Sequence, residues 1–352
     1  MAGKAVLRAE AERLRAAFVA AGAEPVEADI LQPADLLLDL YGEDIRARAF
    51  VTHDPVMGEA MLRPDFTVPV VLAHLEAGRG AARYTYAGEV FRQQEAGSRR
   101  PAEFLQAGLE IFGAAGPEAE AEIFATFAAL LAAHDLAPVT GDIGLLTAAV
   151  DGLDTTPARK AALRRHLWRP RRFKALLERF SRPAASRGAA DTAFEGRGPE
   201  IGLRTSDDVR ARLAALAADA AAPPIPRSDI NALDALLAVR ETAPNALSQL
   251  RNVAVDLPAI TPALDRLAQR LERLAGAGVD VGTLQFEATY GRTTLEYYDG
   301  FVFGFLRPDR PDLPPVASGG RYDALTRALG GAVAPPAIGG VIRPALLPEA
   351  AR

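Results

Sequence analysis

The segment that most constrains this chain is residues 86–113, which read YAGEVFRQQEAGSRRPAEFLQAGLEIFG. Two apolar runs, Tyr86 to Phe91 and Phe104 to Phe112, flank twelve residues rich in Arg, Gln, Glu, Gly and Pro. This layout predicts two antiparallel strands joined by a long polar loop. Ordinary hairpins close with about two to five residues, so a loop of this length indicates a function.

The second strand of this hairpin alternates polar and apolar residues. Gln106, Gly108 and Glu110 therefore share one face of the predicted sheet. A buried carboxylate is costly unless it is paired, so Glu110 predicts a cationic or hydrogen-bond-donating neighbour, which a ligand can supply. A metabolite with an ammonium and polar ring nitrogens suits Asp65, Gln106 and Glu110, whereas Arg92 suits a carboxylate or phosphate.

Two structural alternatives remain open for these residues. Arg92 and Glu110 could pair with each other as a buried strut. Asp65 could instead cap the helix that the sequence predicts from Thr67, where Pro69 lies in the first turn and lacks only an N–H that has no partner there.

Composition excludes several classes of function. The 352 residues carry a net charge of -5, so the broadly basic surface of a nucleic-acid-binding protein is not expected. The chain has no cysteine and its four histidines are scattered, so we expect no metal site, and we predict no cofactor. The charged N-terminal segment does not resemble a secretory signal and no long apolar run occurs, so we expect a cytoplasmic protein without a membrane span.

Strand patterns fill the two ends of the chain and helix patterns fill its middle. We predict an α+β fold in which residues 1–148 and 276–352 build one sheet, with 149–275 as a mostly helical insertion. Within the insertion, residues 159–174 include eight Arg or Lys. This basic segment is either the solvated face of a helix or a contact surface for an anionic partner.

Four motifs, in order, resemble histidyl-tRNA synthetase and its paralogues. They are RPDFT, YAGEVFRQQE with FLQAGLEIFG, LEYYDGFVFGF, and SGGRYDALTRALGG with PAIGG. The resemblance implies the class II synthetase fold, an antiparallel sheet flanked by helices. It also implies a histidine-binding site formed by Asp65, Thr67, Arg92, Gln106, Glu110, Tyr297, Tyr298, Gly319 and Gly320.

The sequence departs from a synthetase at two arginine positions of the family pattern. Thr293 occupies the first, with Arg292 one residue away, and Leu346 occupies the second, three residues after Arg343. A one-residue shift along a strand turns a side chain to the other face, so Arg292 is a doubtful substitute. Losing two charge-stabilising groups predicts that the chain does not activate ATP. We also expect no anticodon-binding domain and no binding of tRNA.

Among the paralogues, this pattern resembles the regulatory subunits of ATP phosphoribosyltransferase. That resemblance implies a non-catalytic chain that assembles with a short-form catalytic subunit, is required for its activity, and mediates feedback inhibition by L-histidine in histidine biosynthesis. It also implies self-association through the synthetase-like core. Two alternatives stay open: a reduced enzyme that adenylates histidine or another amino acid, and a translational regulator that binds RNA.

Overall fold

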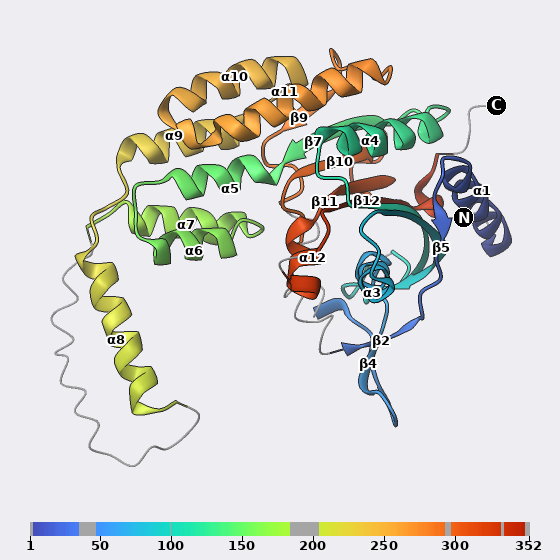
Figure 1. The fold of residues 1–352 in the computed structure, drawn as a ribbon, viewed down its shortest axis with the longest axis horizontal. Helices are drawn as coiled ribbons and strands as arrows, with labels where there is room; N and C mark the ends of the chain where they lie inside the picture. The colour runs from blue at the N-terminus through green and yellow to red at the C-terminus, as the bar shows by residue number, and fades with distance from the viewer. Residues whose placement is uncertain are drawn as a thin grey trace.

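A nine-stranded sheet and a helical arm make up the computed structural model of the chain (Figure 1). Both are built from the residues that the structure describes, which are 3–34, 47–98, 100–183, 204–292, 297–331 and 334–348.

The predicted hairpin forms the longest pair of strands in this sheet. Strands β5 (Ala82–Phe91) and β6 (Glu103–Phe112) pair antiparallel along their whole length, and the polar loop between them covers 92–102. Gly88 lies opposite Gln106, and Tyr84 lies opposite Glu110. The alternation read from the sequence is therefore confirmed.

The rest of the large sheet extends from β6. Its order is β1-β5-β6-β12-β11-β10-β7-β9-β8, and the pairs from β5 through to β7 are all antiparallel. The further strands are β12 (Ala337–Ile342), β11 (Ala317–Arg321), β10 (Phe301–Leu306), β7 (Ala137–Asp142), β9 (Gln285–Glu287), β8 (Arg240–Thr242) and β1 (Glu24–Pro25). This antiparallel sheet flanked by helices confirms the predicted α+β fold class.

Helices cover the two faces of the sheet differently. Helices α1 (Lys4–Ala20) and α4 (Pro117–Leu131) pack on one face, where Phe18 and Phe127 lie in contact. The other face is covered by α3 (Thr67–Ala77), α12 (Asp323–Gly330) and a small sheet of β2 (Leu31–Pro33), β4 (Gly58–Leu62) and β3 (Val51–Asp54). Figure 1 shows α4 above the sheet and α3 below it.

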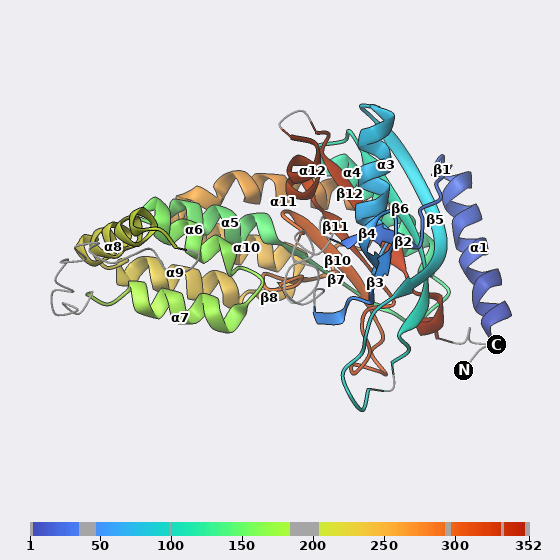
Figure 2. The same ribbon diagram turned by 90° about the horizontal axis from the view of Figure 1, so that it is seen from below.

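The middle of the chain forms the helical arm, which projects from one side of the sheet (Figure 2). Its elements are α5 (Ile143–Gly152), α6 (Pro157–Arg165), α7 (Pro170–Phe180), α8 (Ser206–Ala221), α9 (Arg227–Ala238), α10 (Ala243–Asp256) and α11 (Thr261–Gly276). Helix α5 crosses the boundary expected at 148, and β8 joins the edge of the sheet through β9. The division into core and insertion at 148 and 276 stays a prediction.

Candidate functional site

The face of the large sheet under α3 has a floor made partly of glycine. A Cβ on Gly108 would collide with the ring of Tyr86, and a Cβ on Gly339 would collide with the carboxylate of Glu110. Because these two positions have no side chain, Tyr86 and Glu110 lie directly against the sheet. The glycines thus make room for a group of buried polar side chains, and we call the place where they meet the Glu110 pocket.

Glu110 lies at the centre of this pocket and is fully buried. Three hydroxyl groups donate to its carboxylate: Thr67 Oγ1 at 3.0 Å and Tyr86 Oη at 2.9 Å to Oε1, and Tyr322 Oη at 2.6 Å to Oε2. The donors come from α3, from β5 and from the turn before α12. Four separate segments of the chain therefore meet at one carboxylate.

This carboxylate has no cationic partner among the described residues. Burial raises the pKa of Glu110 to about 7, because the three hydroxyl donors only partly offset the loss of hydration and Asp65 adds a second negative charge. Near neutral pH, Glu110 can therefore act either as an acceptor or as a donor toward a ligand.

Asp65 and Thr67 lie beside Glu110. The backbone N–H of Thr67 donates to Asp65 Oδ1 at 3.1 Å, so Asp65 does bond to the first turn of α3. The Arg92 guanidinium lies 3.9 Å from Asp65 Oδ2 and donates to the carbonyl of Pro64 at 2.8 Å. The alternative in which Arg92 pairs with Glu110 is wrong, because Arg92 makes its contacts at the Asp65 end of the pocket.

Gln106 lies on the same face, nearer to Arg92. Its side chain is buried, and its Oε1 has no hydrogen-bond partner among the described residues. A buried amide oxygen without a donor costs free energy, so this atom is open to a hydrogen bond from a further group.

The two tyrosines of the LEYYDG motif lie before β10, which begins only at Phe301. Just after them, the Asp299 carboxylate accepts from the first N–H groups of α12, Asp323 at 3.0 Å and Ala324 at 2.6 Å. Both tyrosines are buried, and their ring centroids are 4.9 Å apart.

Each of these tyrosines reaches the pocket by a separate contact. Tyr297 Oη donates to Thr67 Oγ1 at 3.4 Å. The ring of Tyr298 covers Gly320, where a Cβ would approach it to 2.9 Å.

The two glycines of the GGRYD motif point to opposite faces. Gly320 lies under Tyr298, whereas a Cβ on Gly319 would meet the ring of Phe303 on the other side of the sheet. The expectation that both glycines line the ligand is therefore wrong for Gly319, because successive residues of a strand alternate.

Two positions were used to exclude ATP activation, Thr293 and Leu346. Thr293 lies outside the described residues. Arg292 is no substitute for the arginine expected there, since it donates to the carbonyl of Leu167 at 2.7 Å and lies over Phe173. Leu346 lies in a 3-10 turn, Pro344–Leu346, packed against the core. Arg343, just before that turn, reaches the pocket face, where its guanidinium donates to Ser318 Oγ at 3.1 Å.

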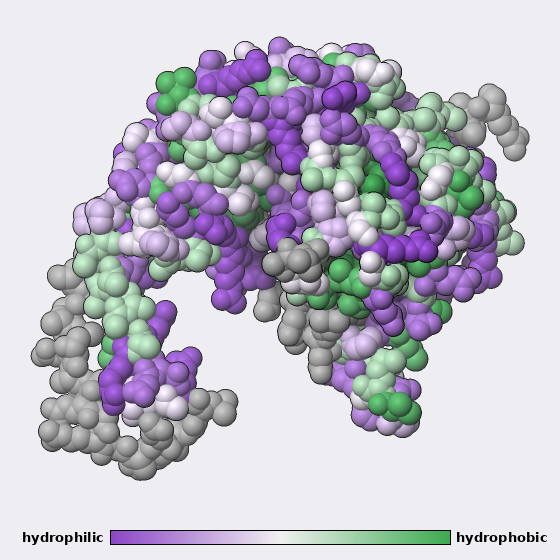
Figure 3. Space-filling model, in the orientation of Figure 1, coloured by the Kyte–Doolittle hydropathy of each residue, from purple (hydrophilic) through white to green (hydrophobic). Residues whose placement is uncertain are grey.

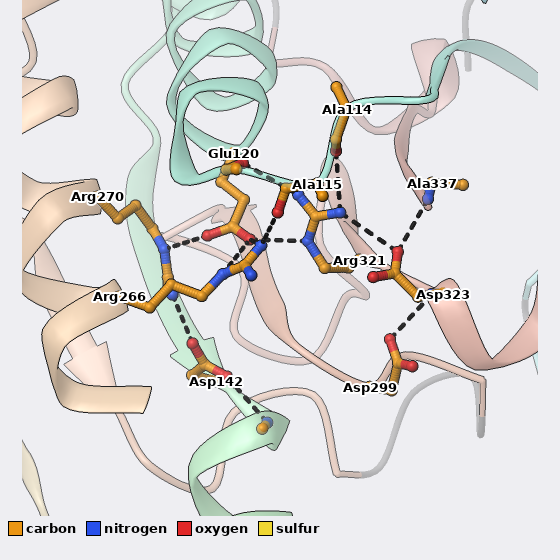
Figure 4. Close-up of polar contacts among 12 residues, drawn as sticks. Ala114, Ala115, Glu120, Asp142, Arg266, Arg270, Asp299, Arg321, Asp323 and Ala337 are labelled. Atoms are coloured by element: carbon orange, nitrogen blue, oxygen red, sulfur yellow. Dashed lines mark hydrogen bonds and ion pairs between the residues drawn. The ribbon is translucent and has the colours of Figure 1, made fainter. Parts of the chain in front are cut away.

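A second buried carboxylate, Glu120 in α4, forms a cluster of a different kind (Figure 4). Arg270 donates to Glu120 Oε2 at 2.7 Å, Arg321 donates to Oε1 at 2.7 Å, and Arg266 also pairs with Oε1. Arg270 continues to Asp142 at 2.5 Å. We call these residues the Glu120 cluster; it ties α11 to α4, β7 and β11.

The charges of this cluster decide the ionisation of Glu120. Burial alone would raise the pKa of Glu120, but attraction to Arg270, Arg321 and Arg266 outweighs it and holds the pKa at about 2. Glu120 is therefore a permanently ionised structural group.

The basic segment 159–174 forms α6 and α7. Part of it is structural, since Arg159 is buried and donates to Asp219 at 2.6 Å, and Arg164 pairs with Asp151. Arg165, His166, Arg169 and Arg172 line an open hollow of about 580 Å³. Neither interpretation of the segment is decided by this arrangement.

The described residues offer neither a metal site nor a membrane span. Within those ranges, no group of His, Asp and Glu is arranged to hold a metal ion. No helix in the same part of the chain has the length and apolar character to cross a membrane.

Sequence reasoning missed three side chains of the pocket: Tyr86, Tyr322 and Arg343. Tyr86 carries a local signal, because it lies in the first strand of the hairpin at the same face as the glycine-spaced polar set. Tyr322 and Arg343 reach the pocket only through long-range strand pairing, which the sequence pattern does not specify.

Comparison with known proteins agrees with this geometry. Residues 4–195 and 203–345 match the family model described as histidyl-tRNA synthetase. The chain is 31% identical to an ATP phosphoribosyltransferase regulatory subunit of Rhizobium rhizogenes, with 93% of each chain covered. It is 32% identical to the protein of the same name from Agrobacterium fabrum, with 92% of this chain and 91% of that one covered.

Solved structures support the fold. A crystal structure described as an ATP phosphoribosyltransferase regulatory subunit/histidyl-tRNA synthetase from Bacillus halodurans has a TM-score of 0.69 at 20% identity, covering 98% of this chain and 79% of that one. Histidyl-tRNA synthetase from Nostoc has a TM-score of 0.64 at 16% identity, covering 97% and 70%. The chain belongs to the histidyl-tRNA synthetase family and, within it, to the ATP phosphoribosyltransferase regulatory subunits, which are regulatory rather than catalytic chains.

Proposed function

We propose that this chain assembles with a short-form ATP phosphoribosyltransferase catalytic subunit, is required for its activity, and lowers that activity when it binds L-histidine. The names of its relatives supply the enzyme and the regulatory role. The histidine-binding part rests on one observation, the buried Glu110 carboxylate with three hydroxyl donors.

Histidine complements the Glu110 pocket group by group. Its imidazole presents an N–H and a ring nitrogen to Glu110, which at a pKa of about 7 can match either tautomer or the protonated ring. Its ammonium suits Asp65 Oδ2, and its polar groups can supply the donor that Gln106 Oε1 lacks within the described chain. Thr67, Tyr297 and Tyr298 close the pocket around these groups.

Feedback requires that histidine bind one state of the complex more tightly than another. The Glu120 cluster can transmit such a difference, because it connects β11 beside the pocket to α11 of the helical arm. Arg321 directly follows Gly320 of the pocket floor and bonds Glu120, which also holds Arg266 and Arg270 of α11. A shift of β11 on ligand binding would therefore move the helical arm as well.

Assembly is supported by apolar side chains left exposed on the small sheet and its flanks: Ile30, Leu31, Val51, Val56 and Met57. Figure 3 shows green residues at the tip of this projection, in the place where Figure 1 has the β3–β4 turn. We assign this surface to contact with the catalytic subunit or with a second copy of this chain, self-associating through the synthetase-like core. We also propose that the complex works in the cytoplasm without tRNA, since the net charge of -5 disfavours nucleic acid.

One observation favours a second candidate, a reduced enzyme that adenylates an amino acid. Arg92 and Arg343 both lie at the pocket, and two arginines can hold a phosphate. Exchange of labelled pyrophosphate into ATP in the presence of histidine would establish that candidate and overturn the non-catalytic function.

The decisive test is reconstitution. A short catalytic subunit is assayed for ATP phosphoribosyltransferase activity alone, with this chain, and with this chain plus histidine. We expect activity only in the mixture and a loss of it on adding histidine. Activity that does not depend on this chain, or that histidine does not change, would contradict the proposal.

A further inference from the structure

Arg343 is a basic side chain at the pocket, and its hydrogen-bond partners within the described ranges are uncharged. Its Nη1 donates to the carbonyl of Pro315 at 2.9 Å and its Nη2 to Ser318 Oγ at 3.1 Å. No carboxylate pairs with it among the described residues. Both of these partners are neutral, so they orient the guanidinium and leave its charge available.

Strand pairing places Arg343 beside Gln106. Ile342 pairs with Ala107, so Arg343 comes level with Gln106, and its backbone N–H continues the ladder by donating to Val316 at 2.8 Å. Gly88 lies opposite Gln106 on the other side, and Arg92 follows four residues later, just beyond the end of β5. The two arginines therefore approach the Gln106 end of the pocket from the strands on either side of β6, with Arg92 further toward the loop.

The charges around these two arginines indicate an anion. Loss of hydration and, after it, the charge of Arg92 lower the pKa of Arg343 to about 10, so a second cation lies close enough to act on Arg343. Like charges brought together this way are stabilised by a shared anionic ligand. Two polar atoms nearby, Gln106 Oε1 and Tyr290 Oη, also lack a partner within the described ranges.

Groups of opposite charge lie apart in the pocket. Arg343 is level with Gln106, whereas Glu110 supplies a buried negative group further along β6. Arg92 lies 3.9 Å from Asp65 Oδ2, which partly neutralises it. Gln106 and Glu110 are four residues apart on one strand, about 13 Å at the usual rise, which a small amino acid and a long arginine side chain together span. This division fits a zwitterion, whose two charges differ in sign.

We propose that Arg343 binds the carboxylate of the amino-acid ligand, with Arg92 on the other side of it and Ser318 as its positioning residue. This inference rests on the proposed function, because it names a ligand group in the pocket that we assign to histidine. In this role Arg343 distinguishes amino acids from the corresponding amines, which lack the carboxylate.

The test compares ligands with and without the carboxylate. Calorimetric titration of the full chain uses histidine, and histamine, which keeps the ammonium and the imidazole. We expect Arg343→Gln to weaken histidine binding at least 10-fold and histamine binding less than 2-fold. Ser318→Ala is a milder change, because it removes only the hydroxyl to which Arg343 donates. It should weaken histidine binding about 3-fold and histamine binding less. Arg307→Gln, which removes an exposed pair with Asp309, is the matched control and should change neither.

Other outcomes would overturn the inference. Equal loss for both ligands in Arg343→Gln and Ser318→Ala would make the arginine structural. Unchanged histidine binding with a selective loss of ATP binding would assign the two arginines to a phosphate. Both results leave histidine binding by the wild-type chain intact, whereas a wild-type chain that does not bind histidine would overturn the proposed function together with this inference.

Discussion

Two glutamates, Glu110 and Glu120, are equally buried but have opposite surroundings. Each has 0% exposure. Glu110 is held by neutral hydroxyls and its pKa is raised to about 7, whereas Glu120 is held by three arginines and its pKa is lowered to about 2. Burial of a carboxylate alone therefore says little about its role. What distinguishes a structural group from a binding group is whether the protein itself supplies the opposite charge.

The largest effect is expected at the Glu120 cluster. Glu120→Gln leaves Arg270 and Arg321 buried with only part of their compensating charge, so the free energy of unfolding should fall by about 3–5 kcal/mol. Urea unfolding of the full chain measures this. Glu118→Gln, in the same helix, removes only an exposed pair with Arg273 and should cost less than about 1 kcal/mol. Equal losses in the two variants would contradict the structural role of Glu120.

The second prediction concerns pH. The folded chain favours protonated Glu110, so this group's stabilisation is present below its ordinary pKa of 4.5 and is lost as pH rises through about 7. Glu110→Gln lacks the group that causes this loss. The free energy of unfolding of the variant minus that of wild type should therefore rise by about 3 kcal/mol between pH 4.5 and 8. The relative stability of Glu120→Gln should stay flat there, since a pKa of about 2 keeps Glu120 ionised throughout.

Urea unfolding at four or five pH values between 4.5 and 8 checks this difference. Glu122→Gln, which removes an exposed pair with Arg83, corrects for general effects of charge on stability. A flat profile for Glu110→Gln would mean that Glu110 is already compensated in the folded chain and would remove the contrast between the two glutamates.

A third prediction separates binding from stability. At pH 7.5, Glu110→Gln should bind histidine about 10–100-fold more weakly, because one strong hydrogen bond to a charged group is worth about 1.5–3 kcal/mol. The thermal unfolding temperature of Glu110→Gln should not fall, because the variant no longer buries a charge. Calorimetric titration with histidine measures the first effect, and Glu122→Gln serves again as the control. Unchanged affinity would move the ligand site away from Glu110.

The two glutamates also show how much the sequence could reveal. Gln106 and Glu110 were identified because a period of two within one strand is a local pattern. The partners of Glu120 lie 146 to 201 residues away in sequence, and nothing local marks Arg270 or Arg321 as buried. Arg343 was not predicted as a pocket residue, since its place beside Gln106 depends on the pairing of β12 with β6.

Gln106 gives the smallest effect and the sharpest contrast. Its Oε1 lacks a partner in the described chain, so the side chain is kept at a cost to stability. Gln106→Met keeps the volume and removes that atom, and the free energy of unfolding should stay equal or rise by up to about 1 kcal/mol. Histidine affinity should fall about 3–10-fold, because the ligand loses one neutral hydrogen bond. Urea unfolding measures the change in stability, and calorimetric titration of the same sample measures the change in histidine affinity. Lower stability with unchanged histidine affinity would instead mean that Gln106 has a structural role, as Glu120 does.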